Sequence, residues 1–533
     1  MKATAPYQWL VLAEPERTAF LEAVRPGVSA EQYERIRALT DAVPALLGVI
    51  DKQGLSLDRV GKIAFGGPTE KTAALSGSEK AAPSSNERPQ KRRRQGHGRR
   101  GAGAYTGARR TKISHPSLQA GQVCPDCQKG KLRSLSKPAT AIHLQAQPPI
   151  TGCVYEREVL RCSLCGKTFT APLPAEAGVE KYDESVGVMA GMLRYGAGMP
   201  FYRLEQWQQN LGVPLPASTQ WELADQVARQ LEPVFDELAL LAAQAPTVFN
   251  DDTTMRVSQL RQEIQSEDKP KRTGVFTTGV VAQPPDHPIA LFFTGRQHAG
   301  ENLNQLLQRR SGELPPPLQM CDGLSRNEPK DMETILACCL AHGRRGFFDV
   351  ASRFPEECEH VLHALREVYR CDAQAKEKGL SAQERLQLHQ AQSQPVMDEL
   401  KTWLDTQIDQ KRVEPNSGLG EAIGFMRRHW VELTRFLHQP GAPLDNNICE
   451  RILKTAILHR KNSLSYKTQR GAQVGDLFMS LIQTCRLNQI NPFTYLLAIV
   501  RHSAQVRAHP KQWLPWNYEK SLADATASQP NTT

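Results

Sequence analysis

The chain has 533 residues, 40% of them hydrophobic and 23% charged, and carries a formal net charge of +10. A chain of this length can bury several cores, so we expect a multidomain globular protein. Its longest apolar runs, such as residues 495–500, are far shorter than the roughly 20 residues that span a bilayer. Glu14 and Glu16 interrupt the apolar start, which disfavours a secretion signal. The composition therefore predicts a cytoplasmic protein with no membrane partner.

The N-terminal region, residues 1–65, is predicted to be helical. Ser29 followed by Gln32 is typical of a capping box, and apolar residues from Ile36 to Ile50 recur at the spacing of a coiled-coil seam. Pro44 falls inside this seam and bends a helix, so a helical hairpin and a dimer zipper both stay open. Either arrangement would serve oligomerisation or DNA binding.

Residues 66–115 are rich in Gly, Ser, Pro and Arg and predict a flexible basic linker. Residues 88–112 alone hold ten Lys and Arg and no Asp or Glu, which leaves 56 basic and 56 acidic residues elsewhere. Such a segment cannot form a core, so we interpret it as an arm for a phosphate backbone or, alternatively, as a solubilising linker. The candidate DNA contacts in it are Arg92, Arg93, Arg94, Arg99 and Arg100.

Four of the twelve cysteines form a pattern. Cys124 with Cys127, and Cys162 with Cys165, have the Cys-x-x-Cys spacing of zinc knuckles, each followed by a glycine. They predict a structural Zn²⁺ site of zinc ribbon type within residues 116–175, with a long insertion between the two pairs. The cysteines that we interpret as core residues are Cys321, Cys338, Cys339, Cys358, Cys371, Cys449 and Cys485.

Apolar residues at helical spacing follow in residues 176–245. Ser218 is a candidate N-cap there, and the helices either form a helix-turn-helix that binds DNA or simply pack in a core.

The pattern then changes to Val-, Thr- and Phe-rich segments, which predict strands. The expected order is strands at residues 246–257, 273–282 and 287–295, a helix at 300–310, and a buried strand at 317–323. This order opens a ribonuclease-H-like α/β core. We assign the core to residues 246–500, with a large helical insertion at about 332–440 and a C-terminal tail at 501–533.

Acidic residues at the ends of these strands are candidate metal ligands. Asp251 and Asp252 end the first strand, and because neighbouring side chains point to opposite faces, only one can enter a shared site. We choose Asp251. Asp322 closes the later buried strand, where Gly323 would let a substrate come close. Mg²⁺ prefers such hard oxygen ligands, and two Mg²⁺ ions can together promote displacement at a phosphodiester.

A third acid, Glu450, lies on a predicted helix with Lys454 and Lys461 on the same face. It would complete the metal site and place cations beside a DNA strand. From spacing alone, however, an ordinary surface ion pair between Glu450 and Lys454 explains the pattern better.

The chain resembles transposases of the bacterial insertion sequence 66 family over nearly its whole length. The matching segments are GHGRRGAGAYTGA at 96–108, the two cysteine knuckles, NDDTTMRV at 250–257, CDGLSRN at 321–327, LAHGRRGFF at 340–348 and PLDNNICERILKTAILHRKNSL at 443–464. The most specific is Leu-Asp-Asn-Asn at 444–447 followed by Glu450-Arg451.

The resemblance implies a DDE-type enzyme in which Asp251, Asp322 and Glu450 are catalytic and hold two Mg²⁺ ions, or Mn²⁺. The enzyme would cut strands at the terminal inverted repeats of the element and transfer them into target DNA. Its partners would be DNA, accessory proteins of the same element and further copies of the chain, in a bacterial nucleoid. The candidate DNA contacts beside the third acid are Arg451, Lys454, Arg460 and Lys461, for which ordinary surface charge is the alternative.

Two departures from the family pattern suggest a subgroup. The family commonly has a tyrosine soon after the second acid and an arginine-proline pair after the Glu-Arg, whereas this chain has residues 324–326 and Lys454-Thr455 there. His342, Arg344 and Arg345 match a family segment, and phosphate binding and packing are equally open roles for them.

A non-catalytic DNA-binding regulator and a nuclease without strand transfer are the alternative functions, and the intact acids argue against the regulator.

Overall fold

The computed structural model describes residues 14–30, 32–34, 36–37, 117–123, 125–126, 128–133, 149–161, 163, 167–174, 180–268 and 272–527. The chain divides into two units, residues 1–79 and 80–533. Several predicted site residues lie outside the described residues, namely Cys124, Cys127, Cys162, Cys165, Arg92, Arg93, Arg94, Arg99 and Arg100. Within the described ranges, no helix has both the length and the apolar character needed to cross a bilayer.

In the first unit the described residues form helix α1 (Glu14–Val24) and the short 3₁₀ helix η2 (Arg25–Gly27). The Ser29 backbone N–H donates to Gln32 Oε1 over 3.0 Å, and the Gln32 N–H donates to Ser29 Oγ over 3.3 Å. These reciprocal bonds confirm the predicted capping box. Most of the expected coiled-coil seam lies outside the described residues.

The backbone pairs with itself on either side of both cysteine pairs. Strands β1 (Val159–Arg161) and β2 (Thr168–Thr170) are antiparallel and flank the second pair. An isolated antiparallel bridge joins Val123 to Lys131 across the first pair. The chain therefore turns back at both places, as a zinc knuckle requires.

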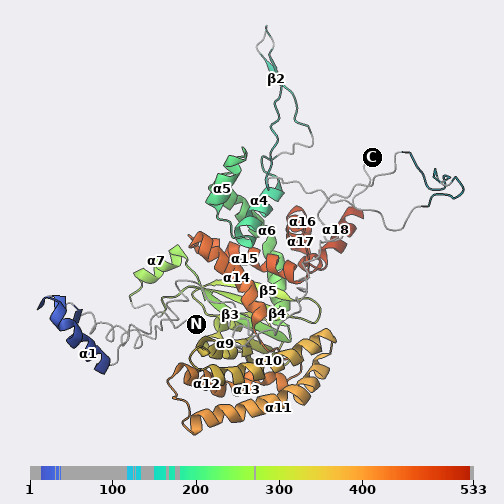
Figure 1. Cartoon of the computed structure of the whole chain (residues 1–533). Helices are drawn as coiled ribbons and strands as arrows, with labels where there is room; N and C mark the ends of the chain where they lie inside the picture. The colour runs from blue at the N-terminus through green and yellow to red at the C-terminus, as the bar shows by residue number, and fades with distance from the viewer. Residues whose placement is uncertain are drawn as a thin grey trace. The chain divides into compact units, whose positions relative to one another are not determined.

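A five-stranded mixed sheet forms the centre of the second unit (Figure 1). Its strands are β3 (Thr247–Thr254), β4 (Phe276–Gln283), β5 (Ile289–Gly295), β6 (Leu318–Cys321) and β7 (Ile335–Cys338). The spatial order is β5-β4-β3-β6-β7, in which β3, β4 and β5 form an antiparallel meander and β6 and β7 run parallel to β3. The mixed α/β fold class and the predicted order of three strands, a helix and a strand are confirmed.

The structure adds one helix and one strand to this order. Helix α7 (Ser258–Ser266) interrupts the meander, and α8 (Ala299–Leu307) is the predicted helix before β6. Strand β7 lies inside the stretch that was expected to be helical from residue 332, so that expectation is wrong at its start. Four apolar residues have no readable period, and only pairing with β6 makes them a strand.

Helices follow β7 and form a compact group in Figure 1. They are α9 (Leu340–Val350), α10 (Pro355–Glu377), α11 (Ala382–Asp409), α12 (Gly418–Arg428) and α13 (Trp430–Leu433). The Arg435 side chain donates to the Leu336 carbonyl over 3.0 Å, which ties the end of this insertion back to the edge strand β7.

Of the helices that precede the sheet in sequence, the longest one packs against β4 and β5, and the others pack on it or on neighbouring helices. These helices are α4 (Glu184–Gly191), the π-helical turn η6 (Met192–Gly196), α5 (Phe201–Asn210) and α6 (Ala217–Ala243). Leu231, Val234 and Leu238 of α6 are fully buried, which favours the packing role for this helix. Pro216 occupies the N-cap of α6 without a side-chain bond, so the prediction of Ser218 as N-cap is wrong.

The chain ends in a second run of helices. They are α14 (Asn447–Ser463), α15 (Gln469–Leu487), α16 (Pro492–Arg501), α17 (Ser503–Ala508) and α18 (Tyr518–Ala527). The region expected as a tail therefore contains helices, and it buries Val506, Trp513 and Leu514.

Strand β5 is an edge strand of the sheet, and helix α15 covers this edge. The backbone N–H groups of Ala290, Phe292 and Thr294 donate to side chains of α15 over 3.0, 2.9 and 2.6 Å. The acceptors are Thr484, Ser480 and Asp476, spaced four residues apart. Four helical residues rise about 6 Å and two strand residues about 6.7 Å, so the two spacings match. The helix thus replaces a missing neighbouring strand.

We expect Ser480→Ala to lower the free energy of unfolding by about 1–3 kcal/mol, because the buried Phe292 N–H would lose its acceptor. Urea unfolding followed by circular dichroism measures this change. Ser218→Ala, at an exposed helical serine that caps nothing, is the matched control and should change stability by less than about 0.5 kcal/mol. Equal effects of the two substitutions would contradict the edge-covering role.

Candidate metal centre

Asp251 and Asp252 point to opposite faces of the sheet. Asp251 is paired across the sheet with Gly279, and a side chain at Gly279 would collide with Leu453 of α14 at 2.9 Å. Asp251 therefore lies on the face that α14 covers. Asp252 is paired with Thr278 and faces α8. The expectation that only one of these acids enters a site shared with Glu450 agrees with this alternation.

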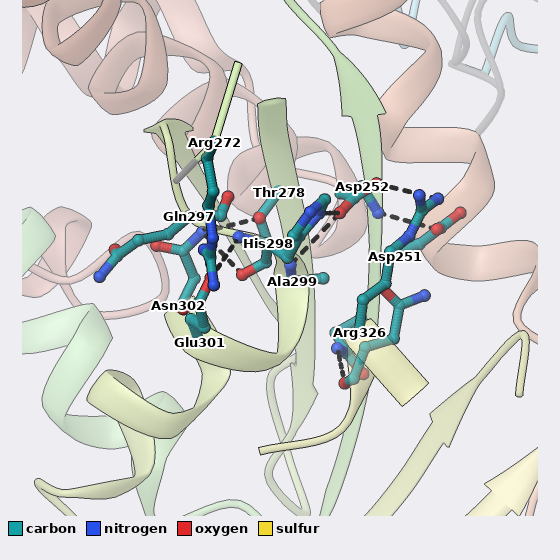
Figure 2. Close-up of polar contacts among 12 residues, drawn as sticks. Asp251, Asp252, Arg272, Thr278, Gln297, His298, Ala299, Glu301, Asn302 and Arg326 are labelled. Atoms are coloured by element: carbon teal, nitrogen blue, oxygen red, sulfur yellow. Dashed lines mark hydrogen bonds and ion pairs between the residues drawn. The ribbon is translucent and has the colours of Figure 1, made fainter. Parts of the chain in front are cut away.

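Asp252 instead anchors a partly buried polar network on the other face of the sheet (Figure 2). Its side chain is 2% exposed, and His298 Nδ1 lies 2.9 Å from its Oδ2. The Ala299 N–H donates to the same oxygen over 3.4 Å, and Arg326 lies 3.5 Å from Oδ1. The carboxylate therefore fastens the start of α8 and the loop after β6 to the sheet. We did not predict this network from the sequence.

Asp322 follows directly after β6, beside Asp251. Strands β3 and β6 are parallel, and their last pair, Phe249 with Met320, lies two residues before each acid. Asp322 Oδ1 accepts from Asn327 Nδ2 over 2.6 Å and from the Leu324 N–H over 3.1 Å, which fixes its orientation.

Gly323 has φ +82°, a left-handed conformation that favours glycine and turns the chain away after Asp322.

Glu450 is brought to the two aspartates by the start of α14. The buried Asn446 side chain donates to the Asn250 carbonyl, adjacent to Asp251, over 3.1 Å. One turn later, Cys449 Sγ lies 3.3 Å from the Gly279 carbonyl. The missing side chain of Gly279 lets the helix approach this closely. Asn446 thus anchors the start of the helix to β3.

The three acids act on one another electrostatically. Burial raises the pKa of the Asp251 carboxyl to about 7, and the negative charges of Asp322, Asp252 and Glu450 add to this shift. Such repulsion disfavours three ionised carboxylates in one place unless a cation neutralises them. Carboxylates that converge from β3, β6 and α14 are the hard donor set that suits Mg²⁺ or Mn²⁺. The donors present therefore fit such a metal.

His342 in α9 and Cys339 at the N-cap of this helix lie close to Glu450. His342 Nδ1 is 3.7 Å from Glu450 Oε1, and the two side chains are 29% and 26% exposed. Cys339 Sγ belongs to the same cluster, in which one ligand atom from each residue lies within 4.8 Å of the others. Cys339 is buried, as predicted for a core cysteine, but its contact with Glu450 was missed. The sequence spacing of 339, 342 and 450 gives no signal for it.

The predicted cationic contacts on α14 fall into two groups. Arg451, Lys454 and Lys461 have exposed side chains. Arg460 instead hydrogen-bonds to Thr253 Oγ1 over 3.1 Å and to Thr254, which ties the last turn of α14 to the end of β3. The opposite side of the helix buries Ile452, Ala456 and His459 together with other residues. The helix therefore has an exposed polar face and a buried apolar one.

Comparison with known proteins identifies the relatives of the chain. The family described as "Transposase IS66 family" matches residues 182–474, which include the sheet, the insertion and α14. Three proteins of Sinorhizobium fredii strain NGR234 are similar, the uncharacterized proteins y4hP, y4jD and y4qI, at 28%, 29% and 24% identity. The alignments cover 75%, 60% and 61% of this chain and 74%, 63% and 61% of the relatives.

We expect Asp251→Asn to stabilise the protein in metal-free buffer. The folded state raises this pKa from 3.8 to about 7, so it binds the proton more tightly than the unfolded chain, and stability falls as pH rises across that window. The variant has no titrating carboxyl at position 251, so its stability does not fall in this way as the pH rises. Its gain should be small near pH 4, grow toward pH 7 and level off above it at about 1–4 kcal/mol. Thermal unfolding across this pH range measures it, and a gain independent of pH would contradict the assigned cause.

Proposed function

The chain belongs to the IS66 family of transposases and thus to a family that acts in DNA transposition, and we propose that it is itself a DDE-type transposase. In this proposal it cuts DNA strands at the ends of an insertion sequence and joins them to target DNA in a reaction that needs divalent metal. The single observation that supports it most is the convergence of Asp251, Asp322 and Glu450 from three separate elements onto one face of the sheet.

Asp251, Asp322 and Glu450 would hold the metal. Two bound Mg²⁺ ions, or Mn²⁺, would neutralise phosphate charge and lower the pKa of an attacking hydroxyl. The protein keeps the carboxylates ready for this task. Asn327 orients Asp322, the Asp252 N–H donates to Asp251 Oδ1 over 2.8 Å, and the anchored start of α14 holds Glu450.

The proposed reaction consists of two in-line displacements at phosphorus. In the first, a water oxygen attacks the phosphodiester at the end of the element, and the 3′ oxygen leaves as a hydroxyl. In the second, that 3′ hydroxyl attacks a phosphodiester of target DNA, and a target 3′ oxygen leaves. The number of phosphodiester bonds is conserved in the second step, and no covalent protein intermediate is needed.

Further parts of the chain would guide DNA to this site. Arg451, Lys454 and Lys461 expose cations along α14 beyond Glu450, which suits a phosphate backbone. We also propose that the basic linker and a four-cysteine zinc module contact the ends of the element. The backbone pairing on either side of both cysteine pairs supports the module. Because two ends must be joined to one target, we expect several copies of the chain on the DNA.

A cleavage assay tests the proposed function. Purified protein would be incubated with labelled duplex that carries the ends of its own element, with and without Mg²⁺, and with other proteins of the element supplied. We expect Asp251→Asn, Asp322→Asn and Glu450→Gln to reduce cutting by a factor on the order of 10³ or more. Asp252→Asn is the matched control. Its amide oxygen can still accept from His298, so cutting should stay within about tenfold of the wild type.

The products separate the alternatives. Binding to the ends without cutting under any of these conditions would favour a regulator, and cutting without joined products would favour a nuclease. Either result would overturn the proposal.

The cations of α14 give a separate test. We expect combined replacement of Arg451, Lys454 and Lys461 by Ala to weaken DNA binding and to make the salt dependence less steep. The slope of log K against log salt should fall by about 2–3, because three phosphate contacts are lost. Fluorescence anisotropy at several salt concentrations measures it. Arg460→Ala is the control, since this guanidinium is bound to β3, and a slope that changes as much in the control would refute the assignment.

A further inference from the structure

We propose that Cys339, His342 and Glu450 form a second metal site, one that selects a borderline transition metal such as Zn²⁺. The inference rests on the proposed function only through Glu450, which the two sites would share. A metal ion bound at this second site would take Glu450 away from the catalytic metal.

The three donors come from two helix starts that are fastened together. Cys339 caps α9, His342 lies in the first turn of α9, and Glu450 lies in the first turn of α14. The Leu340 N–H donates to the Leu444 carbonyl over 2.9 Å, so the chain before α14 is bound directly to α9. The donor atoms lie within 4.8 Å of one another, close enough for small side-chain movements to bring them onto one ion.

The chemistry of the donors selects the metal. A thiolate, an imidazole nitrogen and a carboxylate oxygen suit Zn²⁺ or Co²⁺, whereas Mg²⁺ takes oxygen ligands almost exclusively. Three protein ligands leave a position for water in a tetrahedral site. The trio Asp251, Asp322 and Glu450 offers oxygen alone. The two overlapping sites therefore differ in metal preference while sharing one carboxylate.

Two features of the side chains suit the site to an ion. The backbone N–H of Asn446 points at Cys339 Sγ over 3.2 Å, an arrangement that stabilises a thiolate once the metal has displaced the thiol proton to solvent. Nδ1 of His342 is buried and has no hydrogen-bond partner among the described residues. At 3.7 Å from Glu450 Oε1 it is too distant for a hydrogen bond, but the separation suits two atoms that bind a common ion.

Occupation of this site has a direct consequence for the acids. A Zn²⁺ ion bound to Glu450 Oε1 would turn that carboxylate toward α9 and away from Asp251 and Asp322. It would also add positive charge beside the remaining acids. Zn²⁺ and the catalytic metal would therefore compete, and the protein would be inhibited by a metal that enters through Cys339 and His342.

Cobalt binding to the full-length, DNA-free protein tests the site without any need for activity. Co²⁺ is titrated, in the absence of Mg²⁺, into protein given one equivalent of Zn²⁺ to fill the proposed four-cysteine module, and sulfur-to-cobalt charge-transfer absorption reports binding to a thiolate. We expect the wild type to take up one Co²⁺ more per chain than Cys339→Ser, with the charge-transfer band present only in the wild type. Glu450→Gln should weaken this uptake at least tenfold.

Cys338→Ser is the matched control, because Cys338 is the preceding residue and equally buried but lies outside the donor cluster. It should bind cobalt as the wild type does. His342→Ala changes a partly exposed helical residue and should lose the ion even if Cys339→Ser disturbs folding. Equal cobalt uptake by folded wild type, Cys339→Ser and His342→Ala would overturn the inference. A failed cleavage assay together with this cobalt signature would refute the proposed function alone.

Discussion

The position of α14 on the central strands is the constraint on which the candidate centre depends. Asp251 and Glu450 are almost two hundred residues apart, and the whole helical insertion lies between their elements. The Asn446 side chain joins the start of α14 to the Asn250 carbonyl, and Gly279 leaves the space that Leu453 fills. Without that space the helix would stand further from the sheet, and Glu450 would lose its place beside the aspartates.

Gathering acids in this way opposes stability. Burial and like charge raise the pKa of Asp251 to about 7, which means that the metal-free protein holds a carboxyl under electrostatic strain. The surrounding structure offsets this cost. Asp252 is fixed by His298 and Arg326 on the other face, Asp322 is held by Asn327, and α15 covers the β5 edge with three side-chain acceptors. A rigid frame of this kind keeps the carboxylates ready for cations instead of letting them separate.

The helical insertion also places residues close to Glu450. Its first helix, α9, begins immediately after the edge strand β7 and carries His342 to within 3.7 Å of Glu450. The insertion therefore contributes to the neighbourhood of the third acid. Cys339, which caps this helix, places a sulfur atom in the same cluster as His342 and Glu450.

The sequence by itself determined the element types of the sheet region, because Val, Thr and Phe at β3, β4 and β5 and the polar and apolar faces of α14 have clear local periods. The family motifs selected Asp251, Asp322 and Glu450, which periodicity could not distinguish from other acids. Only the tertiary structure decided which contacts surround them. Strand β7 is too short to show a period, Asn446 reads as an ordinary polar residue before a helix, and Cys339 reads as core. Strand β7 is defined by its pairing with β6, and the roles of Asn446 and Cys339 come from partners over a hundred residues away. Such contacts follow from chain packing, which no local pattern encodes.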